Sequence, residues 1–95
     1  MDAKGAIRKA KAYVADVFAE EGAVNVGLEE LRFDEAHGMW EVTVGFSRPW
    51  DNLSVSYLSM TTPARFRRTY KVVQLSDQDG SVLGMKNRMV ETADA

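Results

Sequence analysis

The first hydrophobic pattern in the chain has the spacing of an α-helix. Between residues 3 and 21 the apolar side chains recur three or four positions apart, at Ile7, Ala10, Val14, Val17 and Phe18. This spacing places them in one stripe along a helix. Asp2 can accept hydrogen bonds from the free amides of a first turn, and Gly22 can adopt the left-handed conformation that ends many helices. We expect an amphipathic helix over residues 3–21 whose stripe packs on the rest of the protein.

The segment after this helix alternates between apolar and polar residues, with one change of parity. The apolar positions are Val24, Val26 and Leu28, followed by Leu31 and Phe33. Alternation with a period of two is typical of a strand with one buried face. A β-bulge at Glu29-Glu30 would put both apolar sets on the same face, because a bulge adds one residue to the strand.

The clearest alternation in the chain runs from Met39 to Ser47. One face would carry Trp40, Val42, Val44 and Phe46, and the other Glu41, Thr43 and Gly45. The polar residues 34–38 that precede this strand end in Gly38 and predict a hairpin loop. We therefore expect the strand at 39–47 to pair antiparallel with the strand before it.

A third strand is predicted from about residue 65 to residue 76. Its parity is ambiguous, because the core face could carry either Tyr70 with Val72 or Val73 with Leu75. The sequence does not decide between these two alternatives.

A turn and a fourth strand complete the predicted fold. Residues 77–80 read Asp-Gln-Asp-Gly, which is typical of a tight turn, and the strand after it covers about 81–89. Leu83 and Met85 are expected on one side of that strand. A chain of 95 residues has the size of one domain. We predict a single α+β domain, residues 1–95, in which one N-terminal helix packs on a four-stranded antiparallel meander sheet, a single layer of each.

The segment from residue 48 to residue 64 interrupts the strand pattern. It is bounded by Pro49 and Pro63, and loops of this length in compact domains are often functional. The segment is unusually apolar for a loop, so its side chains either fold back onto the core or form a contact site. Tryptophan and tyrosine are favoured anchors at protein interfaces. The candidate partner-binding residues here are Trp50, Leu53, Tyr57 and Leu58.

A basic cluster follows at the start of the third strand. It consists of Arg65, Arg67, Arg68 and Lys71, with Phe66 and Tyr70 between them. Arg48, Lys86 and Arg88 could join it, because the second and fourth strands flank the third in a meander. Such a cluster can bind an acidic protein surface, bind single-stranded nucleic acid by charge and stacking, or form an ordinary solvated face. We include Arg65, Arg67 and Arg68 among the candidate partner-binding residues.

Composition and charge narrow the classes of function. The chain has no cysteine, which excludes disulfides, thiolate metal sites and a cysteine nucleophile. Its formal net charge of −2 lacks the basic excess with which nucleic-acid binders contact phosphates. No apolar run approaches the roughly 18–20 residues that span a bilayer, and the N-terminus has no apolar core of signal-peptide length. We therefore expect a cytoplasmic protein that does not contact a membrane.

No arrangement of residues predicts catalysis, a metal site or a cofactor. His37 is the only histidine, and two neighbouring loop carboxylates are a poor set of partners for a general base or a metal ligand. Acidic pairs such as Glu29-Glu30 fit a solvated surface, where most carboxylates lie. Adjacent residues of a strand point to opposite faces, so these two would converge only at a bulge. No serine lies in a nucleophile elbow, and the glycines are too scattered for a phosphate loop. We expect a protein that is not an enzyme and that holds no metal and no cofactor.

The order of elements resembles that of small PepSY-like and cystatin-like α+β domains, in which a sheet wraps one helix. The residues that carry the resemblance are the leading helix, Val26 to Leu31 with its acidic pair, the Trp-Glu-Val-Thr-Val run from Trp40 to Val44, and Tyr70 to Met85 with its Asp-Gly turn. PepSY-like domains are inhibitory or regulatory binding modules, commonly secreted or membrane-attached. This chain lacks an export signal, and it lacks the Gln-x-Val-x-Gly hairpin of cystatin-type inhibitors. The resemblance implies the fold and a binding role, without a protease target.

Three hypotheses for the function remain. The first is a non-enzymatic protein-binding or regulatory module, of the inhibitor, adaptor or immunity type, and binding of a second copy as a homodimer is one form of it. The second is a small-molecule-binding domain with a pocket between sheet and helix, lined by Trp40, Phe46, Tyr70 and Met85. The third is weak nucleic-acid binding through the strand from Arg65 to Lys71, which ranks last because the chain carries net negative charge.

Overall fold

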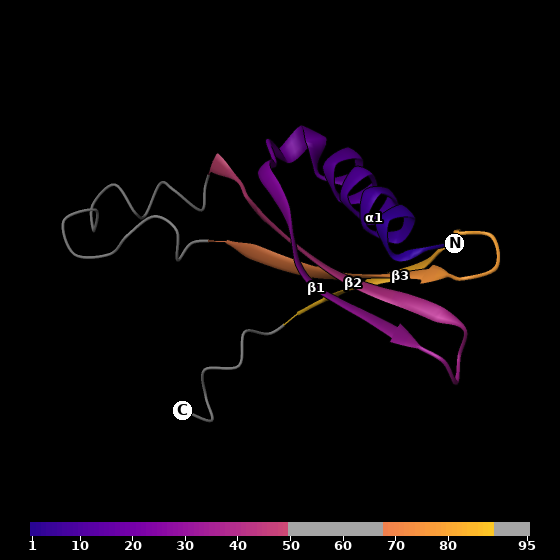
Figure 1. The fold of residues 1–95 in the computed structure, drawn as a ribbon. Helices are drawn as coiled ribbons and strands as arrows, with labels where there is room; N and C mark the ends of the chain where they lie inside the picture. Colours follow the sequence, from indigo (N-terminus) through magenta and orange to yellow (C-terminus); the bar gives the residue numbers. More distant parts are fainter. Residues whose placement is uncertain (50–67, 89–95) are drawn as a thin grey trace, which may run out of the picture.

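One helix lies across one side of a four-stranded antiparallel sheet (Figure 1). The computed structural model describes residues 1–49 and 68–88. The elements are α1 (Ala3–Val17), the 3₁₀ helix η1 (Ala19–Glu21), β1 (Val24–Asp34), β2 (Met39–Ser47), β3 (Thr69–Ser76) and β4 (Val82–Asn87). The strands lie in the order β1-β2-β3-β4, and each neighbouring pair is antiparallel. The predicted α+β fold is confirmed.

The predicted helix divides into an α-helical part and a final 3₁₀ turn. The Asp2 carboxylate accepts a hydrogen bond from the backbone N–H of Gly5 at 2.8 Å, as expected of an N-cap. Gly22 ends η1 with a φ of 75°, in the left-handed region. The buried stripe runs at intervals of four through Ala6, Ala10, Val14 and Phe18. Val17 was expected in this stripe and is exposed instead, because it lies beside that row of residues rather than in it.

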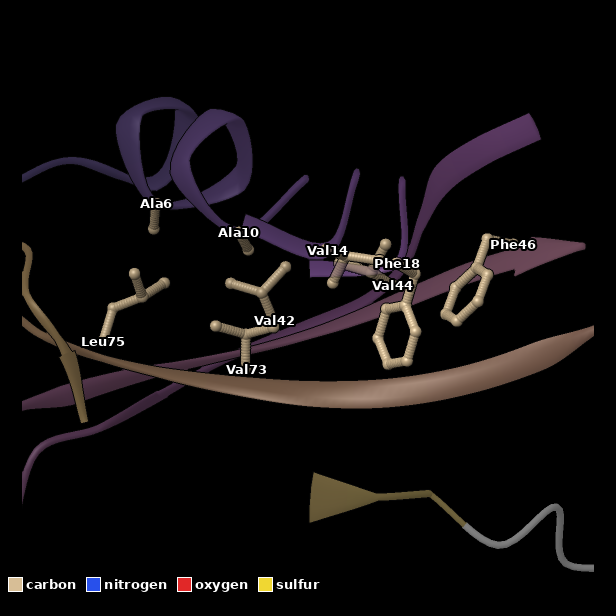
Figure 2. Packing of buried hydrophobic residues seen from close by; sticks show 9 residues of the cluster. All are labelled: Ala6, Ala10, Val14, Phe18, Val42, Val44, Phe46, Val73 and Leu75. Atoms are coloured by element: carbon tan, nitrogen blue, oxygen red, sulfur yellow. The ribbon is translucent and has the colours of Figure 1, made fainter. Parts of the chain in front are cut away.

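The hydrophobic core lies between α1 and the alternate side chains of β2 and β3 (Figure 2). Its largest fully buried members are Val14, Val42, Val44, Phe46, Val73 and Leu75. The rings of Phe18 and Phe46 stack with their centroids 4.8 Å apart. Val73 pairs with Val42 across the strands, so Val73 and Leu75 face the helix. The ambiguity in the third strand is thereby resolved.

Strand β1 contains the predicted bulge and a second irregularity that was not predicted. The register shifts between Leu28 and Glu30, and the shift brings Leu28 and Leu31 opposite Val44 and Val42 on the helix side. Another shift follows Val24, next to Asn25, whose φ is 57°. Val24 therefore pairs with Ser47 and is 51% exposed. The prediction that Val24 lies on the core face is therefore wrong.

Strand β4 also differs from its predicted pattern. A register shift in the β3–β4 pairing places Val82 opposite Leu75 and Met85 opposite Val73, so both pack against the core. Leu83 was expected beside Met85 and is 57% exposed, because the shift removes it from that row. The turn before β4 contains Gly80 with a φ of 73°, as its sequence predicts. No helix of the described part is long and apolar enough to cross a bilayer.

Candidate binding face

The sheet has a second face that points away from α1. We call it the open face, because neither helix of the described part lies on it (Figure 1). Cross-strand partners share a face, so the register defines its members. They include Glu30 and Arg32 of β1, Glu41, Thr43 and Gly45 of β2, Tyr70, Val72 and Gln74 of β3, and Gly84 and Lys86 of β4. Arg68 and Arg88, just outside β3 and β4, also contact this face.

A hollow of about 340 Å³ lies on the open face. Its lining consists of Glu30, Arg32, Glu41, Thr43, Val72, Lys86, Asn87 and Arg88. Thr43 and Val72, from the two central strands, are only 5% and 8% exposed and form the floor. The longer charged side chains come mainly from the outer strands and form the walls. The hollow is thus an open site with a nearly buried floor and walls of both charge signs.

The two carboxylates of the hollow already have partners within the chain. Arg88 makes an ion pair with Glu30 and also donates from Nη1 to the Thr43 hydroxyl at 3.3 Å. Glu41 accepts a hydrogen bond from the side-chain amide of Gln74 at 3.2 Å. These contacts link β1 to β4 and β2 to β3 across the face.

The two remaining cations of the hollow are Arg32 and Lys86. Arg32 pairs in register with Glu41, and Lys86 pairs in register with Val72. Within residues 1–49 and 68–88, neither side chain has a hydrogen bond or an ion pair. Both side chains are exposed. Two positive charges, one from each outer strand, are thus available to a bound group.

Arg68 is the one predicted site residue that the structure describes, and it is tied to β1. Its Nη2 donates to the backbone carbonyl of Asn25 at 3.0 Å and lies 3.4 Å from a carboxylate oxygen of Glu29. The guanidinium lies over Gly45, where a Cβ would come within 2.9 Å of Nη2. Glycine at position 45 therefore allows this close approach. The bulge separates the acidic pair, so that Glu29 contacts Arg68 and Glu30 contacts Arg88.

The other predicted partner-binding residues lie outside the described residues. They are Trp50, Leu53, Tyr57, Leu58, Arg65 and Arg67. The rest of the predicted basic cluster is divided between the two faces of the sheet. Lys71 is on the helix side, where its ammonium contacts Asn87 and lies 5.5 Å from the centroid of the Phe18 ring.

Arg48 also lies away from the open face. Its guanidinium donates to Glu21 at 2.8 Å and to the Thr69 hydroxyl at 3.0 Å. It stacks near the rings of Phe18 and Phe46, with 5.7 and 5.4 Å to the centroids. Arg48 therefore closes one end of the hydrophobic core instead of joining a basic surface with Arg68.

The four residues expected to line a pocket between sheet and helix do not lie together. Phe46 is fully buried, and Trp40 and Met85 pack against the same core. Tyr70 pairs with Gly45 and is on the open face. The indole N–H of Trp40 donates to Asp77 at 2.9 Å, which ties the β3–β4 turn to β2. The hollow described above is on the opposite side of the sheet from Trp40, Phe46 and Met85.

His37 is part of the hairpin between β1 and β2. Its Nδ1 lies 2.9 Å from a carboxylate oxygen of Asp34, and its backbone N–H donates to the other oxygen at 3.2 Å. The hydrogen bond from His37 lowers the pKa of Asp34 below its ordinary value. In the part of the chain that the structure describes, no group of three or more histidine or acidic residues is arranged to hold a metal ion.

The sequence pattern alone does not reveal the hollow as a unit. It singles out Glu30, Lys86 and Arg88 separately and places Glu41 on the correct face, but it gives Arg32 no role. The useful signal is the hairpin at 35–38, because its register places Arg32 opposite Glu41 and Glu30 opposite Thr43. That register identifies the β1 side of the hollow.

Comparison with known proteins assigns neither a family nor a function to the chain. No protein-family model, no curated protein and no solved structure matches the chain. The resemblance to PepSY-like and cystatin-like domains therefore stays a prediction from the sequence. Function has to be argued from the side chains of the open face, because a fold of this kind does not specify one.

Proposed function

We propose that this protein is a small non-enzymatic module that binds another protein on the open face of its sheet. The supporting observation is the hollow with its floor of Thr43 and Val72 and the two cations, Arg32 and Lys86, that lack a partner in the described part of the chain. Charged groups around a contact surface select partners and orient them more than they raise affinity. A charged rim around a nearly buried floor is typical of a small interface.

The long segment between β2 and β3 supplies the second part of the proposed surface. It leaves the described chain after Pro49 and returns at Arg68, so it starts and ends at one end of the sheet. In this proposal its aromatic residues, Trp50 and Tyr57 among them, anchor the partner beside the open face. This part of the proposal rests on the sequence, because residues 50–67 lie outside the described structure.

The other two hypotheses have less support from the described residues. A ligand pocket between sheet and helix would need space where Phe18 and Phe46 stack. A nucleic-acid strip along the third strand would need Arg68 and Lys71 on one surface, and they lie on opposite faces of the sheet. Binding of a protein on the open face requires neither space inside the core nor a single basic surface along the third strand.

A steric block of the open face tests the proposal. Gly84 lies on this face opposite Gln74, and a Cβ there would meet only the Gln74 side-chain oxygen, at 3.3 Å. Gly84→Trp should therefore overhang the hollow without disturbing the core. Ala12→Trp, on an exposed position of α1, is the matched control.

The measurement is capture from the source cells followed by titration calorimetry with the purified partner. We expect a defined protein that binds the wild type and Ala12→Trp equally, and Gly84→Trp at least about tenfold more weakly, equivalent to roughly 1.4 kcal/mol. Equal binding by all three variants would remove the open face as the site. A Trp50→Ala, Tyr57→Ala double variant tests the anchors in the same assay, and unchanged binding would remove them.

A further inference from the structure

The charge pattern of the hollow indicates what kind of partner it would bind. Three cations line it against two carboxylates, and both carboxylates are engaged within the chain, Glu30 by Arg88 and Glu41 by Gln74. Arg32 and Lys86, one from each outer strand of the sheet, have no such partner within residues 1–49 and 68–88. Glu41 keeps its negative charge, because Gln74 is neutral. Three cations against two carboxylates (3 − 2) give the lining a net charge of +1, although the chain as a whole has a formal net charge of −2.

The size of the hollow limits the group that can enter. About 340 Å³ is at the lower end of the volumes typical of ligand sites, roughly 300–1,000 Å³. It has room for a few side chains between its two charged walls. The floor of Thr43 and Val72 offers one hydroxyl and one apolar surface, which suits the stem of a side chain better than a second charge.

We infer that the hollow receives an acidic segment of the partner protein, with one carboxylate paired to Arg32 and a second paired to Lys86. The inference rests on the proposed function and specifies the chemistry of the partner. A guanidinium can hold a carboxylate with two parallel hydrogen bonds, and an ammonium adds a less directional charge. Carboxylates spaced to reach both walls lie across the central strands and cover the floor.

Two other occupants fit the charges less well. A nucleic-acid backbone is a continuous row of phosphates, and Arg32 and Lys86 supply only two cations for it, whereas two carboxylates match them in number. A second copy of this chain would bring two hollows of the same net positive charge against each other. Pairing of copies through the sheet edges is also disfavoured, because the register shifts in β1 and in the β3–β4 pair interrupt both outer strands.

A synthetic peptide tests the inference before the partner is identified. The probe is a blocked ten-residue peptide of alternating Gly and Glu, added to ¹⁵N-labelled full-length protein at low salt. We expect saturable shifts of the backbone amides around Arg32, Thr43 and Lys86. The same peptide with Gln in place of Glu should cause no such shifts, and added salt should weaken binding of the Glu peptide.

Paired variants identify the cations that bind. Arg32→Gln with Lys86→Gln should weaken binding of the Glu peptide about tenfold, because each exposed ion pair contributes modestly and two are lost. Lys4→Gln with Arg8→Gln changes the net charge equally at exposed positions of α1 and should leave binding unchanged. Equal loss in both double variants, or equal binding of the Gln peptide, would overturn the inference.

Two further arms separate this inference from its alternatives. Free glutarate that binds as tightly as the peptide would identify a small-molecule site and overturn the choice of a protein segment. Shifts on the open face that grow with protein concentration, without any peptide, would identify a second copy as the occupant and also overturn it. If the Glu peptide fails to bind while Gly84→Trp still abolishes capture of a partner, the acidic segment is wrong and the proposed function stands.

Discussion

The two faces of this sheet are built by alternate residues of the same strands, yet they use different physical chemistry. On the helix side, Val42, Val44 and Phe46 of β2 are fully buried and their contacts lie within the chain. On the open face the intervening Glu41, Thr43 and Gly45 lie among charged side chains of the other strands. The side chains of the helix side are thus paired by folding, whereas on the open face the charges of Arg32 and Lys86 have no partner among the residues that the structure describes.

The difference separates the residues that stabilise the fold from those available for contact. A shift of one residue moves a strand side chain from one face to the other, so the two sets are interleaved in the sequence but distinct in space. Substitutions on the helix side should therefore affect stability first. Substitutions among the open-face charges should affect binding with little effect on stability.

The largest effect is expected at the centre of the helix side. Phe46→Ala removes a fully buried ring that stacks on Phe18, and a change of this kind costs about 3–5 kcal/mol of unfolding free energy. Leu83→Ala, at an exposed position of β4, should change stability by less than about 0.5 kcal/mol. Urea denaturation of both variants measures the difference. Similar losses for both would contradict the assignment of the core.

A smaller effect is expected where α1 meets the β3–β4 turn. Gly80 has a φ of 73°, and a Cβ there would lie 2.6 Å from the Met1 methyl carbon. Gly80→Ala should therefore destabilise the protein by about 1–2 kcal/mol, the cost of a left-handed conformation for a residue with a Cβ. Gly84→Ala in the adjoining strand is the matched control, since its Cβ would meet only a flexible side-chain oxygen. Equal stability of the two variants would show that the turn is not held in this conformation.

The sequence predicted the helix side of this comparison better than the open face. Apolar residues at fixed spacing are a direct signal, and they placed α1, β2 and the bulge beside Glu30 correctly, apart from Val17, which is exposed. Val24 and Leu83 failed because two further register shifts, one next to Asn25, reverse the parity of short segments. No local residue pattern in the sequence predicts those two register shifts.

The open face was harder to predict because its residues come from all four strands. Arg68 and Lys71 are close in sequence and were grouped as one basic cluster, but strand alternation puts them on opposite faces. Arg32 and Lys86 are far apart in sequence and belong to one hollow. Such a site is visible only after the cross-strand register is known, because charge patterns along the chain do not show it.

A near-zero effect on stability is expected for the open-face cations. Arg32→Gln with Lys86→Gln should leave the urea midpoint almost unchanged, within about 0.5 kcal/mol, because neither side chain has a partner in the described part of the chain and both are exposed. A loss of more than about 1 kcal/mol would mean that these charges support the fold. The distinction between a helix side that stabilises the fold and an open face that is available for binding would then be wrong.

The smallest effect concerns the hairpin that joins β1 and β2, outside both faces. The hydrogen bond from His37 holds the pKa of Asp34 below its ordinary value of 3.8, so His37→Ala should raise that pKa toward 3.8. The sign follows from linkage: a carboxyl with a lowered folded-state pKa stabilises the fold above pH 3.8 and loses that contribution as the pH falls through its folded-state pKa. NMR titration of the carboxyl carbons measures the change.

Asp79 is an internal control, because the backbone and hydroxyl of Ser81 lower its pKa without His37. A rise at both carboxyls would indicate a general change in the fold, whereas a rise at Asp34 alone would show that the hairpin is stabilised locally and independently of the two faces.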